Sequence, residues 1–302
     1  MSVAAAYAAL HSLDGVDVRQ SEPMARHTSF RIGGPADLFV TCDTVASLAA
    51  TLEVLSAEDV PYTVAGKGSN LLVADSGYRG AVMVLGKEFK RHVCEGEHLR
   101  AGAACILAYL VQDAFSKGLG GLEFAVGVPG TLGGALAMNA GSREAWIGAV
   151  TESVTLLVPG TGLVRMRGDE ISWGYRRSGL PERGIIVEGE LRLVPSDPVR
   201  IRAEMERGLT RRRQSQPMGV PSAGSVFVNP EGDSAGRLIE SVGLKGTKLG
   251  GARISDIHAN FIVNDGGATA ADVLGLANKV RTSVRDRHGI ELQTEVRFLG
   301  EF

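Results

Sequence analysis

The stretch that most constrains the fold of this chain runs from Gly118 to Gly141, with the sequence GLGGLEFAVGVPGTLGGALAMNAG. Its 24 residues include eight glycines and one charged side chain, Glu123. Such a run is too rich in glycine for a stable helix interior and too apolar for a disordered linker. It is typical of a loop whose bare N–H groups bind a phosphorylated ligand. It is also typical of tightly packed strand corners without a ligand, and glycine content alone does not separate the two.

A second glycine-containing segment favours the ligand. Residues 64–73, VAGKGSNLLV, form a short apolar run, a GKGSN turn and another apolar run. Two glycines, a hydroxyl and an amide between short strands make a compact loop that suits a pyrophosphate. Neither G-x-x-x-x-G-K-[ST] nor G-x-G-x-x-G occurs in the chain. The predicted dinucleotide site is therefore of neither the P-loop nor the Rossmann type.

Size and composition indicate a globular protein of two or three domains. The 302 residues are 44% hydrophobic and 22% charged, and the formal net charge is −2. This balance argues against nonspecific binding to nucleic acid or to a membrane surface. The chain shows no N-terminal signal segment and no apolar run that could span a bilayer. We therefore expect a cytoplasmic protein in which Cys42, Cys94 and Cys105 remain thiols.

One histidine-containing segment is a candidate metal site. His92, Cys94 and His98 lie close together in the charged stretch KRHVCEGEHLR. No fourth ligand follows at a spacing typical of zinc sites. A solvated pair of strands explains the segment better, and the sequence predicts no metal site.

The order of predicted elements indicates an α+β protein with domains over residues 1–85, 86–199 and 200–302. Hydrophobic periodicity and turn residues predict the elements. Strands are expected at 36–42, 62–65, 81–85, 185–194, 260–264 and 291–298, hairpins at 89–104 and 151–167, and helices at 4–13, 45–57, 106–115, 197–213, 235–242 and 269–288.

Seven segments together resemble one family, the UDP-N-acetylenolpyruvoylglucosamine reductases (UDP-N-acetylmuramate dehydrogenases). They occur in the family's order, at compatible spacing, over nearly the whole chain. The segments are TSFRIGGPAD (28–37), GKGSNLLV (66–73), VGVPGTLGGALAMNAG (126–141), GYRRS (174–178), PSAGSVFVNP (221–230), AGRLIESVGLKG (235–246) and LQTEVRFLG (292–300).

The resemblance implies a two-domain FAD-binding fold of the vanillyl-alcohol-oxidase (PCMH) type, followed by a C-terminal α+β substrate-binding domain. It also implies an enzyme of peptidoglycan precursor synthesis. NADPH, acting through bound FAD, would reduce the enolpyruvyl ether of UDP-N-acetylglucosamine enolpyruvate to the lactyl ether of UDP-N-acetylmuramate. We expect a monomer whose partner is this UDP-sugar, with no nucleic acid or membrane bound.

The family's catalytic residues correspond to Arg176, Ser225 and Glu295. By resemblance, the flavin N5 hydride goes to the enol ether and Ser225 gives the proton. Arg176 and a protonated Glu295 stabilise the enolate-like charge. From the residues alone, these three are better explained as a loop arginine, a turn residue and a solvent-facing strand residue, and it is the resemblance that reverses this order.

Binding residues also follow from the resemblance. The expected FAD contacts are Gly66, Gly68, Ser69, Asn70, Gly130, Thr131, Gly134, Asn139 and Gly141. Asn229 is expected to bind the UDP-sugar phosphates, and Tyr175 and His258 to lie near the substrate. A core or capping role explains Tyr175 and His258 about as well.

The chain departs from the family pattern at two positions. Val228 stands where the family usually has lysine, and Asn260 stands where glycine is common. Residues 211–213, three arginines, are best explained as a solvated helix end, and they are also candidates to replace the missing charge. The length resembles the shorter class of the family, which lacks an inserted tyrosine-bearing loop.

Two other functions were compared with this one. Another FAD oxidoreductase of the same fold would share the loops of the first two domains but not GSVFVNP and TEVRFLG. A non-catalytic nucleotide-binding protein would be colourless when purified.

Overall fold

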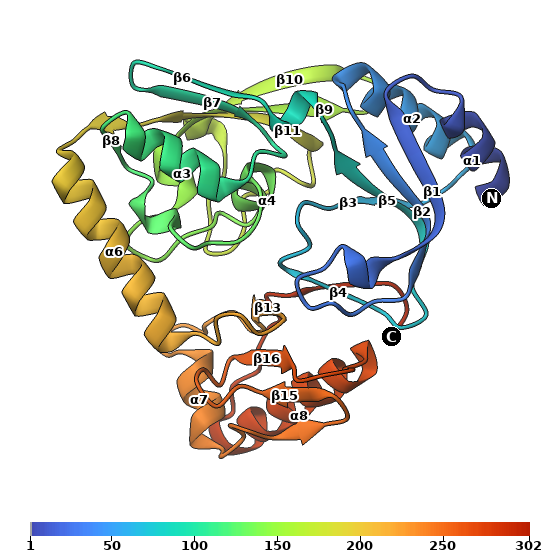
Figure 1. The fold of residues 1–302 in the computed structure, drawn as a ribbon. Coiled ribbons are helices and arrows are strands. Elements are labelled where there is room, and N and C mark those ends of the chain that lie inside the picture. The colour runs from blue at the N-terminus through green and yellow to red at the C-terminus, as the bar shows by residue number, and fades with distance from the viewer. Residues whose placement is uncertain (1) are drawn as a thin grey trace. The chain divides into compact units, whose positions relative to one another are not determined.

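The computed structural model describes residues 2–302 (Figure 1). The chain forms two compact units. The first unit contains residues 2–20, 38–66 and 80–210, and the second contains residues 21–37, 67–79 and 211–302. The chain passes from one unit to the other within strands β1 (Val16–Pro23), β2 (Pro35–Cys42) and β5 (Tyr78–Leu85), after residue 66, and within helix α6 (Pro198–Ser215).

A mixed sheet begins the fold, with strand order β1-β2-β5-β3. Its edge strand β3 (Tyr62–Val64) runs parallel to β5. Helices α1 (Val3–His11) and α2 (Val45–Ala57) contribute buried side chains to the same core as β2. Helix α2 begins at Thr44, whose hydroxyl accepts a hydrogen bond from the Ser47 N–H in a capping box.

A five-stranded antiparallel sheet of order β10-β9-β11-β7-β6 forms the rest of the core of the first unit. Its strands are β6 (His92–Glu95), β7 (His98–Gly102), β9 (Thr151–Val158), β10 (Gly162–Arg167) and β11 (Ile185–Arg192). The register contains a β-bulge, because Glu190 pairs with Ser153 whereas Leu191 pairs with Thr151. Glu152 is the extra residue in β9.

Short elements pack on this sheet. Helices α3 (Leu107–Ser116), α4 (Leu132–Ala137) and α5 (Ile147–Val150) contribute buried residues, and β8 (Leu119–Gly120) pairs with β12 (Val194–Pro195). Short 3-10 turns cover Met24–Arg26, Glu88–Lys90, Glu123–Ala125 and Gly168–Glu170. Helix α4 corrects the expectation that the glycine-rich stretch is non-helical: Thr131 caps this short helix, whose residues Leu132 and Leu136 are fully buried.

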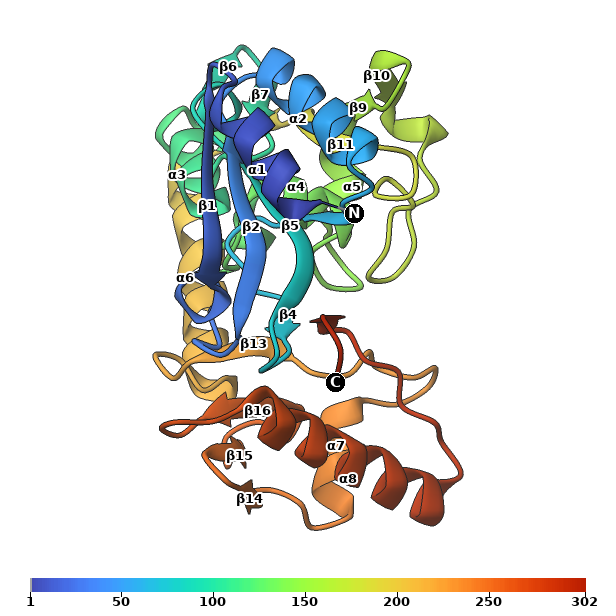
Figure 2. The same ribbon diagram turned by 90° about the vertical axis from the view of Figure 1, so that its right-hand side faces the viewer.

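The second unit contains a small antiparallel sheet of order β13-β16-β15-β14, with helices α7 and α8 (Figure 2). The bounds are β13 (Ser222–Ser225), α7 (Ala235–Ser241), β14 (Lys248–Leu249), β15 (Ala252–Ile254), β16 (Phe261–Asn264) and α8 (Ala270–His288). Helix α8 begins with a capping box at Thr269 and ends at Gly289, which has the left-handed φ of 70°. Buried residues of α8, among them Leu276 and Val280, pack in one cluster with α7 and the sheet.

Two expectations for strands were wrong. The last strand, predicted for 291–298, is only β17 (Arg297–Leu299), which runs parallel to β4 (Leu71–Val73). Residues before β17 make isolated backbone hydrogen bonds instead of a ladder. Strand β1 was missed because it buries little: of its residues only Val18 is buried, so it shows no apolar alternation.

Candidate active site

In the first unit, the two glycine-containing loops lie against each other. A Cβ atom placed on Gly66 would lie 2.7 Å from Thr131 Oγ1, a distance that real Cβ atoms do not show. Only glycine therefore allows the start of the GKGSN turn to lie so close to Thr131. The Thr131 hydroxyl accepts a hydrogen bond from the Gly134 N–H at 3.4 Å, and the Gly130 carbonyl accepts one from Leu107 N at 3.2 Å. Four predicted FAD contacts are thus brought together.

The end of the glycine-rich stretch is tied to the GYRRS loop by Asn139. This side chain is 7% exposed. Its Nδ2 donates to the Gly174 carbonyl at 2.9 Å, and its Oδ1 accepts from the Gly148 N–H at 3.1 Å. Asn139 therefore fixes the backbone from which Arg176 projects, a role that its motif did not indicate.

Arg176 is held on this loop by a second bond to the glycine-rich stretch. Its Nη1 donates to the Gly141 carbonyl at 2.7 Å, and its Cζ lies 5.1 Å from the centroid of the Tyr175 ring. The Arg143 Cζ lies 6.0 Å from the same ring. Arg176 has φ of 59°, which is uncommon for a residue with a side chain and is found preferentially at functional sites. Two guanidinium groups and a half-exposed phenol make this loop suited to an anion.

In the second unit, Ser225 and Glu295 lie on neighbouring segments of backbone. Ser225 ends β13, and the carbonyl of the next residue, Val226, accepts a hydrogen bond from the Glu295 N–H at 2.8 Å. Asn70 Nδ2 donates to the Glu295 carbonyl at 3.0 Å, and the Asn70 carbonyl accepts from Arg297 N at 3.0 Å. Asn70 therefore positions the backbone of Glu295.

The rest of the GKGSN turn packs on the TSFRIGG segment of the same unit. Gly68 has φ of 61°, and a Cβ atom there would lie 2.0 Å from the His27 carbonyl oxygen. The Gly68 carbonyl accepts a hydrogen bond from Ser29 N at 3.2 Å. Ser69 follows as a half-buried residue. At position 68, any residue with a side chain would displace this turn.

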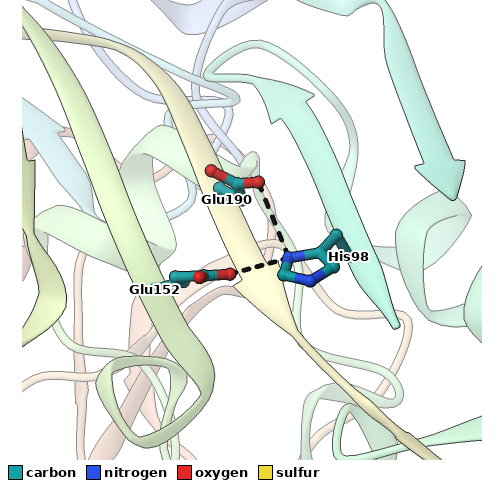
Figure 3. A group of neighbouring side chains, drawn as sticks. All are labelled: His98, Glu152 and Glu190. Carbon is teal, nitrogen blue, oxygen red and sulfur yellow. Dashed lines mark ion pairs between the residues drawn. The ribbon is translucent and has the colours of Figure 1, made fainter. Parts of the chain in front are cut away.

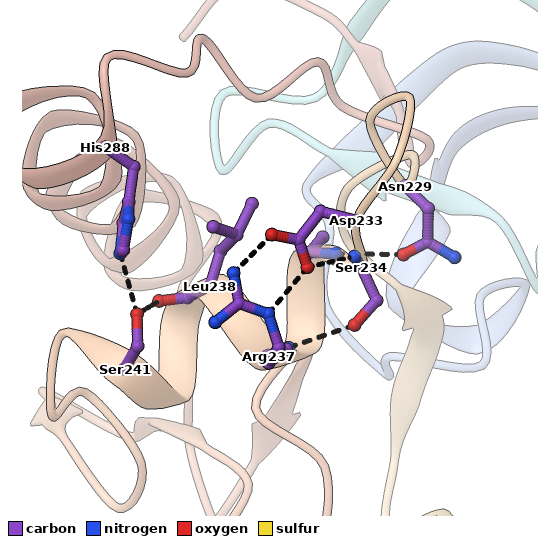
Figure 4. A network of polar contacts seen from close by, with 8 residues as sticks. Asn229, Asp233, Ser234, Arg237, Leu238, Ser241 and His288 are labelled. Carbon is purple, nitrogen blue, oxygen red and sulfur yellow. Dashed lines mark hydrogen bonds and ion pairs between the residues drawn. The ribbon is translucent and has the colours of Figure 1, made fainter.

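Asn229 and the start of α7 form a polar network (Figure 4). Asn229 Oδ1 accepts a hydrogen bond from the Ala235 N–H at 3.0 Å, so it caps the helix start together with Ser234. Arg237 pairs with Asp233 and holds the pKa of that carboxyl at about 2. Asn229 thus has a structural contact in addition to the phosphate contact predicted for it.

His258 and Asn260 brace the segment that follows Ser225. Asn260 is 2% exposed, and its Oδ1 accepts from the Phe227 N–H at 2.9 Å while its Nδ2 donates to the Phe227 carbonyl at 2.8 Å. The His258 Nδ1 accepts from the Asn260 N–H at 3.1 Å. Burial lowers the pKa of His258, and the charge of Lys245 lowers it further. Asn260, which stands where the family commonly has glycine, therefore satisfies the hydrogen-bonding capacity of both the N–H and the C=O of Phe227.

The other departure from the family pattern has a simpler setting. Val228 donates its N–H to the Gln293 carbonyl at 2.9 Å, and its side chain is half-buried. No charge stands at this position. Residues 211–213 form the last turns of α6, and their predicted compensating role stays a prediction.

Comparison with known proteins identifies the class. A model described as "FAD binding domain" matches residues 36–166. A second model, described as "UDP-N-acetylenolpyruvoylglucosamine reductase, C-terminal domain", matches residues 216–299. The chain is therefore an FAD-binding protein whose C-terminal part is particular to one group of reductases. The second match decides against the two other functions compared above.

Relatives along the full length identify the family. The chain is 47% identical to UDP-N-acetylenolpyruvoylglucosamine reductase of Heliobacterium modesticaldum, over 93% of this chain and 90% of that protein. It is 46% identical to the reductase of Geobacter metallireducens, over 98% of each. The crystal structure of the Thermus caldophilus reductase matches with a TM-score of 0.81 and 37% identity, covering 94% of this chain and 98% of that one. The chain belongs to the UDP-N-acetylenolpyruvoylglucosamine reductase family.

Membership confirms the expected fold class, the FAD cofactor and the reductase activity on a UDP-sugar. Among residues 2–302, no helix combines the length and the apolar character needed to span a membrane.

Replacing Asn260 with the glycine common in the family should destabilise this protein. Asn260→Gly leaves the N–H and C=O of buried Phe227 without their side-chain partners, at a cost of about 3 kcal/mol. Urea unfolding at pH 7 measures the change. The control Asn278→Ala, at an exposed position of α8, should change the free energy of unfolding by less than about 0.5 kcal/mol. Equal values for the two variants would contradict the bracing role.

His258 should make stability depend on pH. Because its pKa is lower in the folded protein than its ordinary value near 6.5, the unfolded chain takes up its proton first as the pH falls. The free energy of unfolding should therefore decrease between pH 7 and pH 5. His258→Asn keeps an acceptor for the Asn260 N–H and removes this titration, so its unfolding free energy should decrease less over the same range. Parallel pH profiles would refute the assignment.

Proposed function

We propose that this protein reduces UDP-N-acetylglucosamine enolpyruvate to UDP-N-acetylmuramate with NADPH, through bound FAD, and that Arg176, Ser225 and Glu295 are its catalytic residues. The observation that carries the assignment is the hydrogen bond from Glu295 N to the Val226 carbonyl, which puts Glu295 beside Ser225 within one unit. Family membership supports the reaction, and the matched motifs support the residues.

The loops described above fit a dinucleotide. The close approach of Gly66 to Thr131 brings the two glycine-containing segments together. The residues proposed to contact FAD are those expected from the motifs: Gly66, Gly68, Ser69, Asn70, Gly130, Thr131, Gly134, Asn139 and Gly141. When bound, FAD supplies the hydride that the terminal carbon of the enol ether receives.

Ser225 would supply the proton to the neighbouring carbon. A serine hydroxyl is a weak acid, so the transfer requires a carbanion-like acceptor. Ser225 is half-buried and precedes Val226, Phe227 and Val228, whose backbone N–H groups are all hydrogen-bonded. This would limit the positions open to the Ser225 hydroxyl. An efficient proton donor requires a hydroxyl that is restricted to positions close to the acceptor carbon.

Glu295 and Arg176 would stabilise the charge that develops on the substrate carboxylate and the carbon next to it. A protonated Glu295 could donate one hydrogen bond, and Asn70 holds its backbone for that purpose. Arg176 would bind the carboxylate with its forked guanidinium, and Tyr175 would hold that group by its ring face. We propose Asn229 and His258 as further contacts of the UDP-sugar.

The remaining expectations are part of the same proposal. They are a three-domain organisation over residues 1–85, 86–199 and 200–302, and a cytoplasmic monomer that binds neither nucleic acid nor membrane. The three cysteines support a reducing compartment: they are thiols in the structure, and burial raises the pKa of each.

Ser225→Ala should separate the two half-reactions. Reduction of the flavin by NADPH should keep nearly its full rate, whereas reoxidation by UDP-N-acetylglucosamine enolpyruvate should slow roughly 100- to 10,000-fold, because only the latter step needs the proton. Anaerobic stopped-flow absorbance of the flavin measures both rates. Ser222→Ala, on the same strand, is the matched control and should leave both unchanged. Equal slowing of both half-reactions by Ser225→Ala would reject the proton-donor role.

Glu295→Gln should also act on the second half-reaction. The amide keeps the size of the side chain and can still donate a hydrogen bond, but it cannot share a proton with the developing carboxylate charge. We expect flavin reoxidation to slow, but by less than the roughly 100-fold that losing a stabilising donor altogether costs. Unchanged reoxidation by the substrate would remove Glu295 from the catalytic residues.

A further inference from the structure

Three metal-ligating side chains meet on the outer face of the five-stranded sheet of the first unit (Figure 3). His98 comes from β7, Glu152 from β9 and Glu190 from β11, three strands that are neighbours in the sheet. The His98 Nδ1 lies 2.8 Å from Glu152 Oε2 and 3.7 Å from Glu190 Oε1. One ligand atom from each residue can be chosen so that all three lie within 4.8 Å of one another.

The bulge in β9 creates this group. Without the extra residue, Glu152 would pair with Leu191 and share its buried face. Because Thr151 pairs with Leu191 instead, Glu152 and Ser153 both project to the face that carries Glu190. Bulges of this kind commonly aim a side chain at a functional site.

We propose that His98, Glu152 and Glu190 bind one divalent transition-metal ion of the Zn²⁺ class. One imidazole nitrogen and two carboxylate oxygens are ligands that Zn²⁺ accepts, whereas Ca²⁺ and Mg²⁺ prefer oxygen alone. With metal–ligand bonds of about 2.1 Å, two ligands of a tetrahedral ion lie roughly 3.4 Å apart. The 3.7 Å separation is already close to this value. Binding of the ion requires the 2.8 Å separation between His98 and Glu152 to widen toward the same value.

Neighbouring side chains orient Glu190 for this role. Arg165 and Ser153 both bond to its Oε2, Ser153 at 3.2 Å, which leaves Oε1 directed at His98. Arg165 also donates through Nε to Ser153 Oγ at 3.0 Å. Arg165, Ser153 and Glu190 are therefore each hydrogen-bonded to the other two. Partners that bond the second oxygen of a carboxylate ligand are typical of metal sites, because they fix its orientation. The site is separate from every residue proposed above for catalysis or for FAD.

The ion would join three adjacent strands and leave a coordination position open to solvent. Zn²⁺ added to the chelator-treated, FAD-containing protein should therefore bind with one ion per chain and raise the unfolding temperature. Isothermal titration calorimetry measures the binding and a thermal scan the stabilisation. Ni²⁺ and Co²⁺ should compete with Zn²⁺, and millimolar Mg²⁺ should not.

Variants decide whether these three residues hold the ion. Glu152→Gln and His98→Gln should each weaken Zn²⁺ binding at least about ten-fold. The controls Glu97→Gln, in the turn before β7, and His92→Gln, on the neighbouring strand β6, should bind as the unchanged protein does. Glu152→Gln removes no bond from Arg165, and the pair of Glu152 with His98 is largely exposed, so the variant should unfold at nearly the same temperature without metal. Absence of Zn²⁺ binding, or binding that persists unchanged in Glu152→Gln and His98→Gln, would overturn the proposal.

Discussion

Asparagine side chains pair with backbone groups at several places where this fold leaves regular secondary structure, and the segments proposed for catalysis depend on those pairs. Buried N–H and C=O groups must find partners when no strand or helix supplies them. Asn260 supplies both partners of Phe227, and Asn139 joins two separate loops through its two ends. The Asn70 side chain donates a hydrogen bond to the Glu295 carbonyl. These bonds replace a ladder and leave the neighbouring side chains unconstrained by the alternation of a strand.

Asn70 and Asn139 stand in segments that resemble cofactor loops, and both were predicted to contact FAD. Their amide groups contact protein backbone in the structure. A residue that shapes a loop and a residue that binds the ligand are equally required by the same function, so a shared motif does not distinguish them. The hydrogen-bond partners give both asparagines a positioning role, which is compatible with the FAD contacts proposed for them.

The sequence predicted those elements whose caps, apolar spacing or turn residues lie within the element or next to it. The apolar spacing and Thr44 cap of α2, the capping box and Gly289 of α8, and the hairpin of β9 and β10 all depend on residues near in sequence. Strand β1 gave no signal because seven of its eight residues are not buried, and β17 is short because its partner β4 has only three residues. The pairing of residues 71–73 with 297–299 is set by tertiary contacts that no short window contains.

The same limit applies to the site. Arg176, Ser225 and Glu295 came from a resemblance, and no spacing in the chain connects them. The group of His98, Glu152 and Glu190 was not predicted, although His98 was considered together with His92 and Cys94. A search along the sequence compares neighbours, whereas an antiparallel sheet brings together residues about 50 and 90 positions apart. The bulge adds a second obstacle, because it reverses the face that simple alternation assigns to Glu152.

The two departures from the family pattern affect one short segment in different ways. Asn260 changes how the segment is held, because its amide closes the backbone of Phe227. Val228 changes only its charge, because the backbone bond from Val228 N to Gln293 does not depend on the side chain. A lysine at 228 would attract a diphosphate by a Coulomb interaction that falls off with distance and salt. Its loss should therefore weaken binding of the charged substrate without displacing Ser225. The path of the backbone and the electrostatics of the site are thus set by separate residues, and each can vary while the other is kept.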